Sequence, residues 1–132
     1  MMDPEPVFLT LAETFEIHAY QIQHFGGSDG MRSREMVESS IGMPSSTFGG
    51  AYLHPTVPDM AAAYLFHLVE NHPFLDGNKR VGTMSALVFL ELNGYDFDAT
   101  DDELTDIVLQ VAGGKMPKDV LSAFFRQHSH SR

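Results

Sequence analysis

Two long apolar segments with a short, densely polar segment between them dominate the sequence. The first reads MAAAYLFHLV at residues 60–69, and the second reads MSALVFLEL at residues 84–92. The first is apolar on nearly every face, which is typical of a helix buried at the centre of a domain. Residues 71–80, NHPFLDGNKR, lie between them. We therefore expect an all-α domain in which two central helices meet at a polar loop.

Start and stop signals along the chain predict a compact bundle of about six helices. Thr10-x-x-Glu13 and Thr100-x-x-Glu103 have the pattern of capping boxes, in which each side chain bonds to the backbone N–H of the other residue. Glycine pairs and prolines mark the places where helices end. The expected helices lie at residues 10–26, 33–43, 58–72, 77–93, 100–113 and 117–126.

The remaining segments are short, and nothing in the sequence marks a domain boundary. Residues 1–9 are expected to be an extended lead-in, residues 28–32 a turn, residues 95–99 a linker, and residues 127–132 a frayed polar tail. With 132 residues, 43% of them hydrophobic, the chain is the right size for one domain spanning residues 1–132. The last helix is expected to bury Val120, Leu121, Phe124 and Phe125.

The charge of the chain excludes several classes of partner. Eight Lys and Arg against eighteen Asp and Glu give a formal net charge of −10. Direct contact with nucleic acid needs a clustered basic surface, so we expect none, and an anionic membrane is disfavoured for the same reason. There is no cysteine, no apolar run long enough to span a bilayer, and no signal-peptide pattern in the acidic start MMDPEP. We expect a soluble cytoplasmic protein.

Residues 45–57 form the longest stretch without helical periodicity. The stretch contains a Gly49-Gly50 pair together with residues that favour strands, among them Thr47, Phe48 and Tyr52. Such a long irregular segment in a small domain is usually functional. We expect a loop or a short hairpin at this position.

The residue types of the polar loop favour chemistry on phosphate groups. A helix that starts at Gly77-Asn78 presents free N–H groups and the positive end of its dipole to an anion. Lys79 and Arg80 oppose that dipole unless an anion binds. Asp76 could hold Mg²⁺, which prefers one or two carboxylates plus phosphate oxygens. His72 could accept a proton near neutral pH. The loop therefore predicts a phosphoryl- or nucleotidyl-transfer site.

Structural interpretations of the same residues stay open at this point. His72 could be an ordinary histidine at a helix end, and Asp76 could be only an N-cap. His67 lies five residues before His72, not the three or four that place two ligands on one helix face, so a zinc pair is disfavoured. His18 lies in an apolar stripe and is interpreted as structural, although it could approach the loop. The histidines of residues 127–132 are assigned to the tail.

The segment His-Pro-Phe-x-Asp-Gly-Asn-Lys-Arg at residues 72–80 resembles the signature of the Fic/Doc family at eight of nine positions. The resemblance extends to the Phe-Gly-Gly that ends the first expected helix, to Thr-Phe-Gly-Gly at residues 47–50 and to Leu-Asn-Gly-Tyr at residues 92–95. These features are similar to the death-on-curing (Doc) branch, whose members are toxins of type II toxin–antitoxin modules. The resemblance implies a small helical bundle that carries one flap.

The resemblance also implies a role for each residue of the motif. It makes His72 the catalytic base, which activates a hydroxyl on a target protein, and Asp76 the ligand of Mg²⁺. Phe74 is the apolar residue that anchors the loop in the core. The residues implied to bind the phosphates of ATP are Gly77, Asn78, Lys79 and Arg80. The flap, residues 45–57, would align the target by strand addition through Thr47, Phe48, Gly49 and Gly50.

Two positions depart from the members that transfer AMP. In those members, which resemble this chain in the rest of the motif, Gly is typical at the position of Lys79 and a second Arg at the position of Thr83. Lys79 is similar to the branch that transfers the γ-phosphate of ATP. The resemblance therefore implies an ATP- and Mg²⁺-dependent protein kinase that modifies a Ser or Thr hydroxyl, with a translation elongation factor as the expected target and growth arrest as the result. AMP transfer and a non-catalytic, partner-sequestering module are the alternatives.

The chain lacks the inhibitory helix that many Fic proteins carry. That helix has the pattern Ser/Thr-x-x-x-Glu-Gly/Asn, and the only Glu followed by Gly or Asn here is Glu70, with Phe66 where the hydroxyl residue should be. Control must then come from another chain. The expected partner is a Phd-like antitoxin, a segment of which folds into an apolar groove on this protein.

Overall fold

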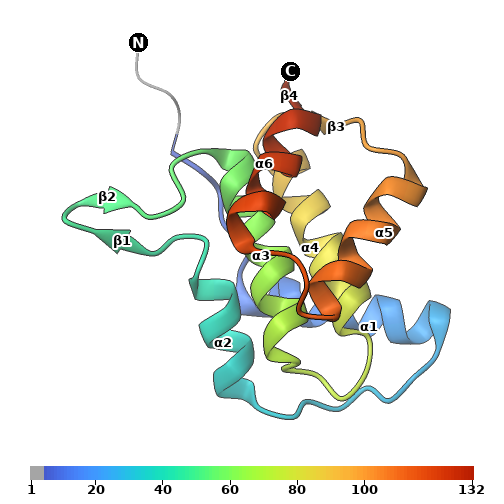
Figure 1. Ribbon diagram of the computed structural model, residues 1–132. Helices are drawn as coiled ribbons and strands as arrows, with labels where there is room; N and C mark the ends of the chain where they lie inside the picture. The colour runs from blue at the N-terminus through green and yellow to red at the C-terminus, as the bar shows by residue number, and fades with distance from the viewer. Residues whose placement is uncertain (1–4) are drawn as a thin grey trace.

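Two antiparallel helices, α3 (Val57–Asn71) and α4 (Asn78–Leu92), form the centre of the molecule (Figure 1). The computed structural model describes residues 5–132. The two helices approach each other closely at Gly82, where an added Cβ would lie only 2.9 Å from Val69 Cγ2 and 3.2 Å from the Leu65 carbonyl oxygen. No residue larger than glycine fits that crossing without moving a helix.

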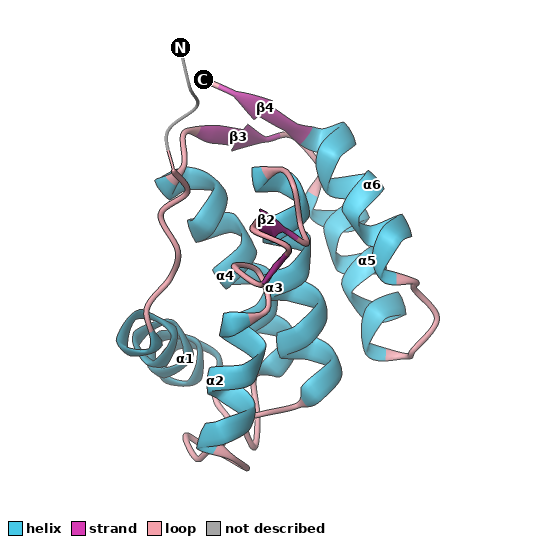
Figure 2. Cartoon of the chain, turned by 90° about the vertical axis from the view of Figure 1, so that its left-hand side faces the viewer, coloured by secondary structure: helices cyan, strands magenta, loops and turns pink. Residues whose placement is uncertain are grey.

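Four helices surround the central pair, as Figures 1 and 2 show. Helices α1 (Leu11–Phe25) and α2 (Arg34–Gly42) pack on one side of the pair, and α5 (Asp101–Ala112) and α6 (Lys118–His128) pack on the other. The main core is made of buried residues of α3 to α6. A smaller cluster beneath the polar loop consists of Val37, Leu68, Phe74 and Val81. The predicted all-α bundle of six helices is confirmed.

Side-chain caps explain where the helices start. The two predicted capping boxes are present: Thr10 with Glu13 begins α1, and Thr100 with Glu103 begins α5. A third, Thr56 with Asp59, starts α3 at Val57, one residue earlier than expected. No helix in residues 5–132 has both the length and the apolar character needed to cross a bilayer. The expected lead-in is irregular at residues 5–10, and its first four residues lie outside the described part.

Three predictions for the C-terminal part were wrong. Residues 95–99 are not only a linker, because β3 (Tyr95–Phe97) pairs with β4 (Ser129–Ser131) in an antiparallel ribbon. The expected frayed tail is therefore the end of α6 followed by a strand. Val120, expected to be buried, is 48% exposed. Pairing between segments more than thirty residues apart leaves no periodic signal in either segment, so the sequence could not predict the ribbon.

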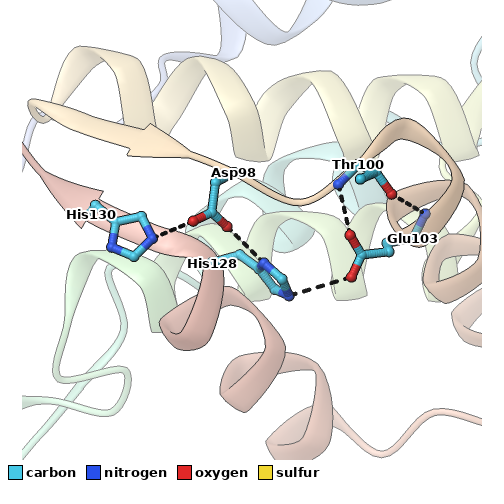
Figure 3. A network of polar contacts seen from close by, with 5 residues as sticks. All are labelled: Asp98, Thr100, Glu103, His128 and His130. Carbon is cyan, nitrogen blue, oxygen red and sulfur yellow. Dashed lines mark hydrogen bonds and ion pairs between the residues drawn. The ribbon is translucent and has the colours of Figure 1, made fainter.

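Asp98 joins the two histidines of this ribbon (Figure 3). His128 Nδ1 lies 2.7 Å from Asp98 Oδ1, and His130 Nε2 lies 2.6 Å from Asp98 Oδ2. His128 Nε2 also lies 3.8 Å from a carboxylate oxygen of Glu103, in the capping box of α5. These hydrogen bonds hold the pKa of Asp98 below its usual value of 3.8. The assignment of both histidines to a tail without contacts is thus wrong.

The lowered pKa of Asp98 predicts a pH-dependent contribution to stability. Because the folded protein favours the ionised carboxylate, the contribution is fully present above pH 3.8 and is lost as the pH falls through the lower folded-state pKa. We expect wild type to unfold at higher urea concentration than Asp98→Asn at pH 6, and the gap to shrink steadily below pH 3.8. Asp102→Asn, an exposed acid with no such contact, serves as the control. A gap that persists undiminished in acid would contradict the assignment.

Candidate active site

His72 ends α3 in an unusual backbone conformation. It is the C-cap of the helix, with φ 47° and ψ 54°, and it is the sole non-glycine residue with positive φ between residues 5 and 132. The left-handed region costs a non-glycine residue roughly 1–2 kcal/mol. Strain of this kind persists where the surrounding structure imposes it, and it clusters at functional sites. The His72 side chain is exposed, at the helix end predicted from the sequence.

Phe74 fixes the middle of the loop in the core. Its ring is 1% exposed and stacks on the His18 ring with 3.9 Å between centroids, while Phe15 meets it edge-on. The Asn78 side chain closes the loop, since its Oδ1 accepts from Phe74 N at 3.0 Å and its Nδ2 donates to Phe74 O at 2.9 Å. The Asn78 amide is thus occupied within the loop, and its contact with phosphate stays a prediction.

The Asp76 carboxylate is exposed and held from one side. Oδ2 accepts a 2.8 Å hydrogen bond from the backbone N–H of Ser28, and its other oxygen has no partner within the described residues. The Asp76 carbonyl accepts from His18 Nε2 at 3.0 Å, so that nitrogen carries the proton. The N-cap of α4 is Gly77, which makes no side-chain cap. Asp76 is therefore not the cap, and one carboxylate oxygen is free for a ligand.

We call the uncapped start of α4, where the sequence predicts a bound anion, the anion seat. Gly77 has φ 82°, a left-handed conformation that suits glycine, and with no side-chain cap the first N–H groups of the helix are left free. Lys79 and Arg80 are exposed, and neither forms an ion pair with any residue of the described chain. The Arg80 guanidinium lies 4.9 Å from the centroid of the Phe25 ring.

A cavity of about 420 Å³ gathers five of the predicted site residues, residues 76–80. This volume is within the range of small-molecule sites. His72 is not among the lining residues. A larger cavity of about 630 Å³ adjoins it and shares Phe25, Lys79 and Arg80. The smaller cavity is lined by Phe25, Gly26, Gly27, Asp76, Gly77, Asn78, Lys79 and Arg80.

Comparison with known proteins gives this arrangement a family. A model of the Fic/DOC family matches residues 8–90, well over half of the chain. The chain belongs to the Fic/Doc family. It is 34% identical over 103 residues to Toxin Doc of Mycolicibacterium smegmatis, covering 75% of this chain and 78% of that protein. It is also 34% identical over 106 residues to Protein kinase doc of Escherichia phage P1, covering 79% and 81%. The resemblance predicted from the motif is confirmed.

The expected Fic/Doc flap is a short hairpin. Strands β1 (Thr47–Phe48) and β2 (Ala51–Tyr52) pair in antiparallel fashion, and Gly49 and Gly50 turn between them with φ 61° and 83°. Two consecutive residues with positive φ are the mark of a hairpin turn that matches strand twist. Phe48 is 81% exposed at this tip. The hairpin lies within the predicted residues 45–57, although Val57 already belongs to α3.

The sequence did not predict which segment holds the Fic/Doc motif in place. Residues 28–32 were expected to be only a turn, but they run antiparallel to the motif loop through a bridge between Met31 and Phe74. Leu75 N donates to Gly30 O at 2.9 Å, and Arg32 N donates to Pro73 O at 2.8 Å. We call residues 28–33 the bracket. Gly30 is the residue whose type could have indicated this close approach, because a Cβ added there would lie 2.6 Å from Leu75 Cδ1.

His67, on α3, makes a contact away from the motif loop. Its Nε2 accepts a 2.8 Å hydrogen bond from Lys118 Nζ. Burial, followed by the nearby Lys118 charge, lowers the pKa of His67 to about 4. Within residues 5–132, no group of three or more His, Asp or Glu side chains is arranged to bind a metal ion by itself. A metal at Asp76 would therefore take its other ligands from water or a bound substrate.

Proposed function

We propose that this chain is the toxin of a toxin–antitoxin module and that it transfers the γ-phosphate of ATP to a Ser or Thr hydroxyl of a protein, with a translation elongation factor as the target. The observation that carries the proposal is the cavity at the start of α4. It joins an uncapped helix N-terminus to two cations without ion pairs and to the Asp76 carboxylate. The toxin and kinase names of two relatives over three quarters of their length support it.

Each side chain has a defined task in the proposed reaction. His72 accepts the proton of the target hydroxyl as its oxygen bonds to the γ-phosphorus. The bond between that phosphorus and the bridging oxygen breaks, and ADP leaves with the bonding electrons. The N–H groups that follow Gly77, together with Lys79 and Arg80, stabilise negative charge on the phosphate oxygens. Catalysis of this kind depends on position and charge, and both are provided by one short loop.

The residues present fit Mg²⁺ together with a nucleotide. Asp76 offers one carboxylate oxygen without a partner, and its other oxygen is fixed by Ser28 N–H. Mg²⁺ commonly uses one or two protein carboxylates and takes its other ligands from phosphate and water. When bound, the ion would neutralise part of the negative charge on the phosphates. Asp76 is the residue that would hold it.

Lys79 and Thr83 favour phosphate transfer over AMP transfer. The position where AMP-transferring relatives are expected to have a second arginine is Thr83, whose hydroxyl donates to the Lys79 carbonyl at 2.7 Å. That hydroxyl is directed back to the helix and supplies no positive charge. A nucleotide at this site therefore lacks the second clamp implied for AMP transfer.

Isotope labelling tests the proposed reaction directly. The protein, MgCl₂ and a purified translation elongation factor are incubated with ATP labelled either at the α- or at the γ-phosphate. We expect label on the target only from the γ-phosphate and only with Mg²⁺. Label from the α-phosphate would establish AMP transfer instead. If growth arrest on expression persists equally with His72 and Asp76 both replaced, the protein acts by sequestering a partner rather than by catalysis.

An antitoxin would cover the groove beside the site. The 630 Å³ cavity between α1, α4 and α5 meets a second one of about 450 Å³, and the two share Gln21 and Met84. Phe25 and Leu109 line the larger cavity and are 60% and 56% exposed. An exposed apolar groove of this size suits an amphipathic segment of another chain. A Phd-like antitoxin seated there would also contact Lys79 and Arg80, which the groove shares with the anion seat.

A further inference from the structure

The conformation of His72 needs a support that the motif itself does not contain. The left-handed conformation is strained for a histidine, so His72 would relax to another conformation if nothing held it there. Its φ and ψ also set the direction of its Cα–Cβ bond, and therefore the position of the imidazole. The residues beside His72 restrict its conformation only in part. Helix α3 ends at Asn71, and Pro73 restricts its own φ and the conformation of His72, the residue before it. The His72 carbonyl lies at the negative end of the α3 dipole, where carbonyl groups lack helical partners.

Arg32, in the bracket, provides that support. Its guanidinium Nη1 donates to the His72 carbonyl at 3.1 Å, and its backbone N–H donates to the Pro73 carbonyl at 2.8 Å. Arg32 therefore contacts two consecutive peptide groups at the point where the chain leaves α3. Its side chain forms no ion pair among residues 5–132, so the carbonyl is its acceptor in the folded protein.

The same bracket also fixes the other end of the motif loop. Ser28 N–H bonds to the Asp76 carboxylate at 2.8 Å, and Gly30 O accepts from Leu75 N at 2.9 Å. One short segment between α1 and α2 thus determines where the proposed base and the proposed metal ligand lie relative to each other. A rigid connection of this kind matters because transfer rates fall steeply with small displacements of a catalytic group.

We propose that Arg32 is a positioning residue for His72. Its guanidinium holds the His72 carbonyl, which keeps His72 in the left-handed conformation and presents the imidazole to the target hydroxyl. The role of the imidazole in this inference rests on the proposed function, whereas the backbone effect does not. Arg32 does not contact the reacting atoms, and it is not among the residues that line the anion seat.

The experiment compares Arg32→Ala and Arg32→Lys with Arg34→Ala. Arg34 is a matched control, because it is an exposed arginine two residues away. Its guanidinium pairs with Glu38 on α2 and lies 5.7 Å from the centroid of the Phe15 ring, and it makes no hydrogen bond to the motif loop within residues 5–132. Phosphoryl transfer is measured with labelled ATP and a purified translation elongation factor. We expect Arg32→Ala to lower kcat roughly 10- to 100-fold, with KM for ATP unchanged within about twofold. Arg32→Lys should recover part of kcat, and Arg34→Ala should match wild type.

A second measurement is independent of activity. NMR of the free protein gives the Cα and Cβ chemical shifts of His72, which report its φ and ψ. We expect them to leave left-handed values in Arg32→Ala and to stay unchanged in Arg34→Ala. Unchanged shifts, or an unchanged kcat in an active protein, would overturn the inference. A fall in kcat matched by a loss of ATP binding would also overturn it. If wild type transfers no phosphate, the proposed function fails, and the shifts alone decide the role of Arg32.

Discussion

Replacing His72 with alanine is expected to lower phosphoryl transfer by about 10²–10⁴-fold, the usual contribution of a general base. The fold should survive, because the His72 side chain is exposed. The free energy of unfolding should change by no more than about 0.5 kcal/mol. The measurements are label transfer from γ-labelled ATP, growth after induced expression, and urea unfolding.

His24 offers the matched control for this variant. It is also an exposed histidine, on α1, and its ring stacks on Tyr20 rather than lying in the motif. His24→Ala should transfer phosphate and arrest growth as wild type does. Full growth arrest by a folded His72→Ala variant would remove His72 as the base and would favour action by sequestration.

Replacing Phe74 with alanine is expected to have the largest effect on stability. The ring is almost fully buried, stacks on His18 and packs with Val37, Leu68 and Val81. Removing a buried phenylalanine ring costs about 3–5 kcal/mol. That is a large part of the total for a domain of this size, which is about 5–15 kcal/mol. Urea denaturation followed by circular dichroism measures the change.

Phe48 makes the same substitution informative in an exposed setting. It is 81% exposed at the tip of the flap, so Phe48→Ala removes an equal side chain without opening a cavity. We expect the unfolding midpoint of Phe48→Ala to stay near that of wild type. A change in phosphate transfer by this variant would indicate that Phe48 contacts the target. Equal destabilisation by the two substitutions would show that Phe74 does not anchor the loop.

For Phe74, the sequence predicted a role but not the contacts that support it. Phe74 was predicted as an anchor from its place in a motif, and its burial agrees with that role. The groups that hold it, His18 and the Asn78 amide, were assigned other roles or left open. Motif patterns indicate which residues matter together, but they do not show which hydrogen bonds each side chain makes.

The residues of the proposed site also differ in how far the sequence predicts their positions. Residues 76–80 lie at one cavity because they are consecutive residues around a helix start, where local geometry decides their neighbours. Whether His72 reaches the same substrate depends on the backbone direction after α3. The sequence does not predict its left-handed conformation, since few non-glycine residues adopt positive φ, even though histidine is enriched among them.

The six helices, two of the three capping boxes, the position of the hairpin and the family could be predicted from the sequence, because each depends on residues close together in the chain. Only the tertiary structure decided what supports the motif loop and where the C-terminal residues lie. The bonds from His18 and Ser28 to Asp76, and from Arg32 to His72, join residues separated by 58, 48 and 40 positions. Such contacts form only when helices pack together, so no local pattern encodes them.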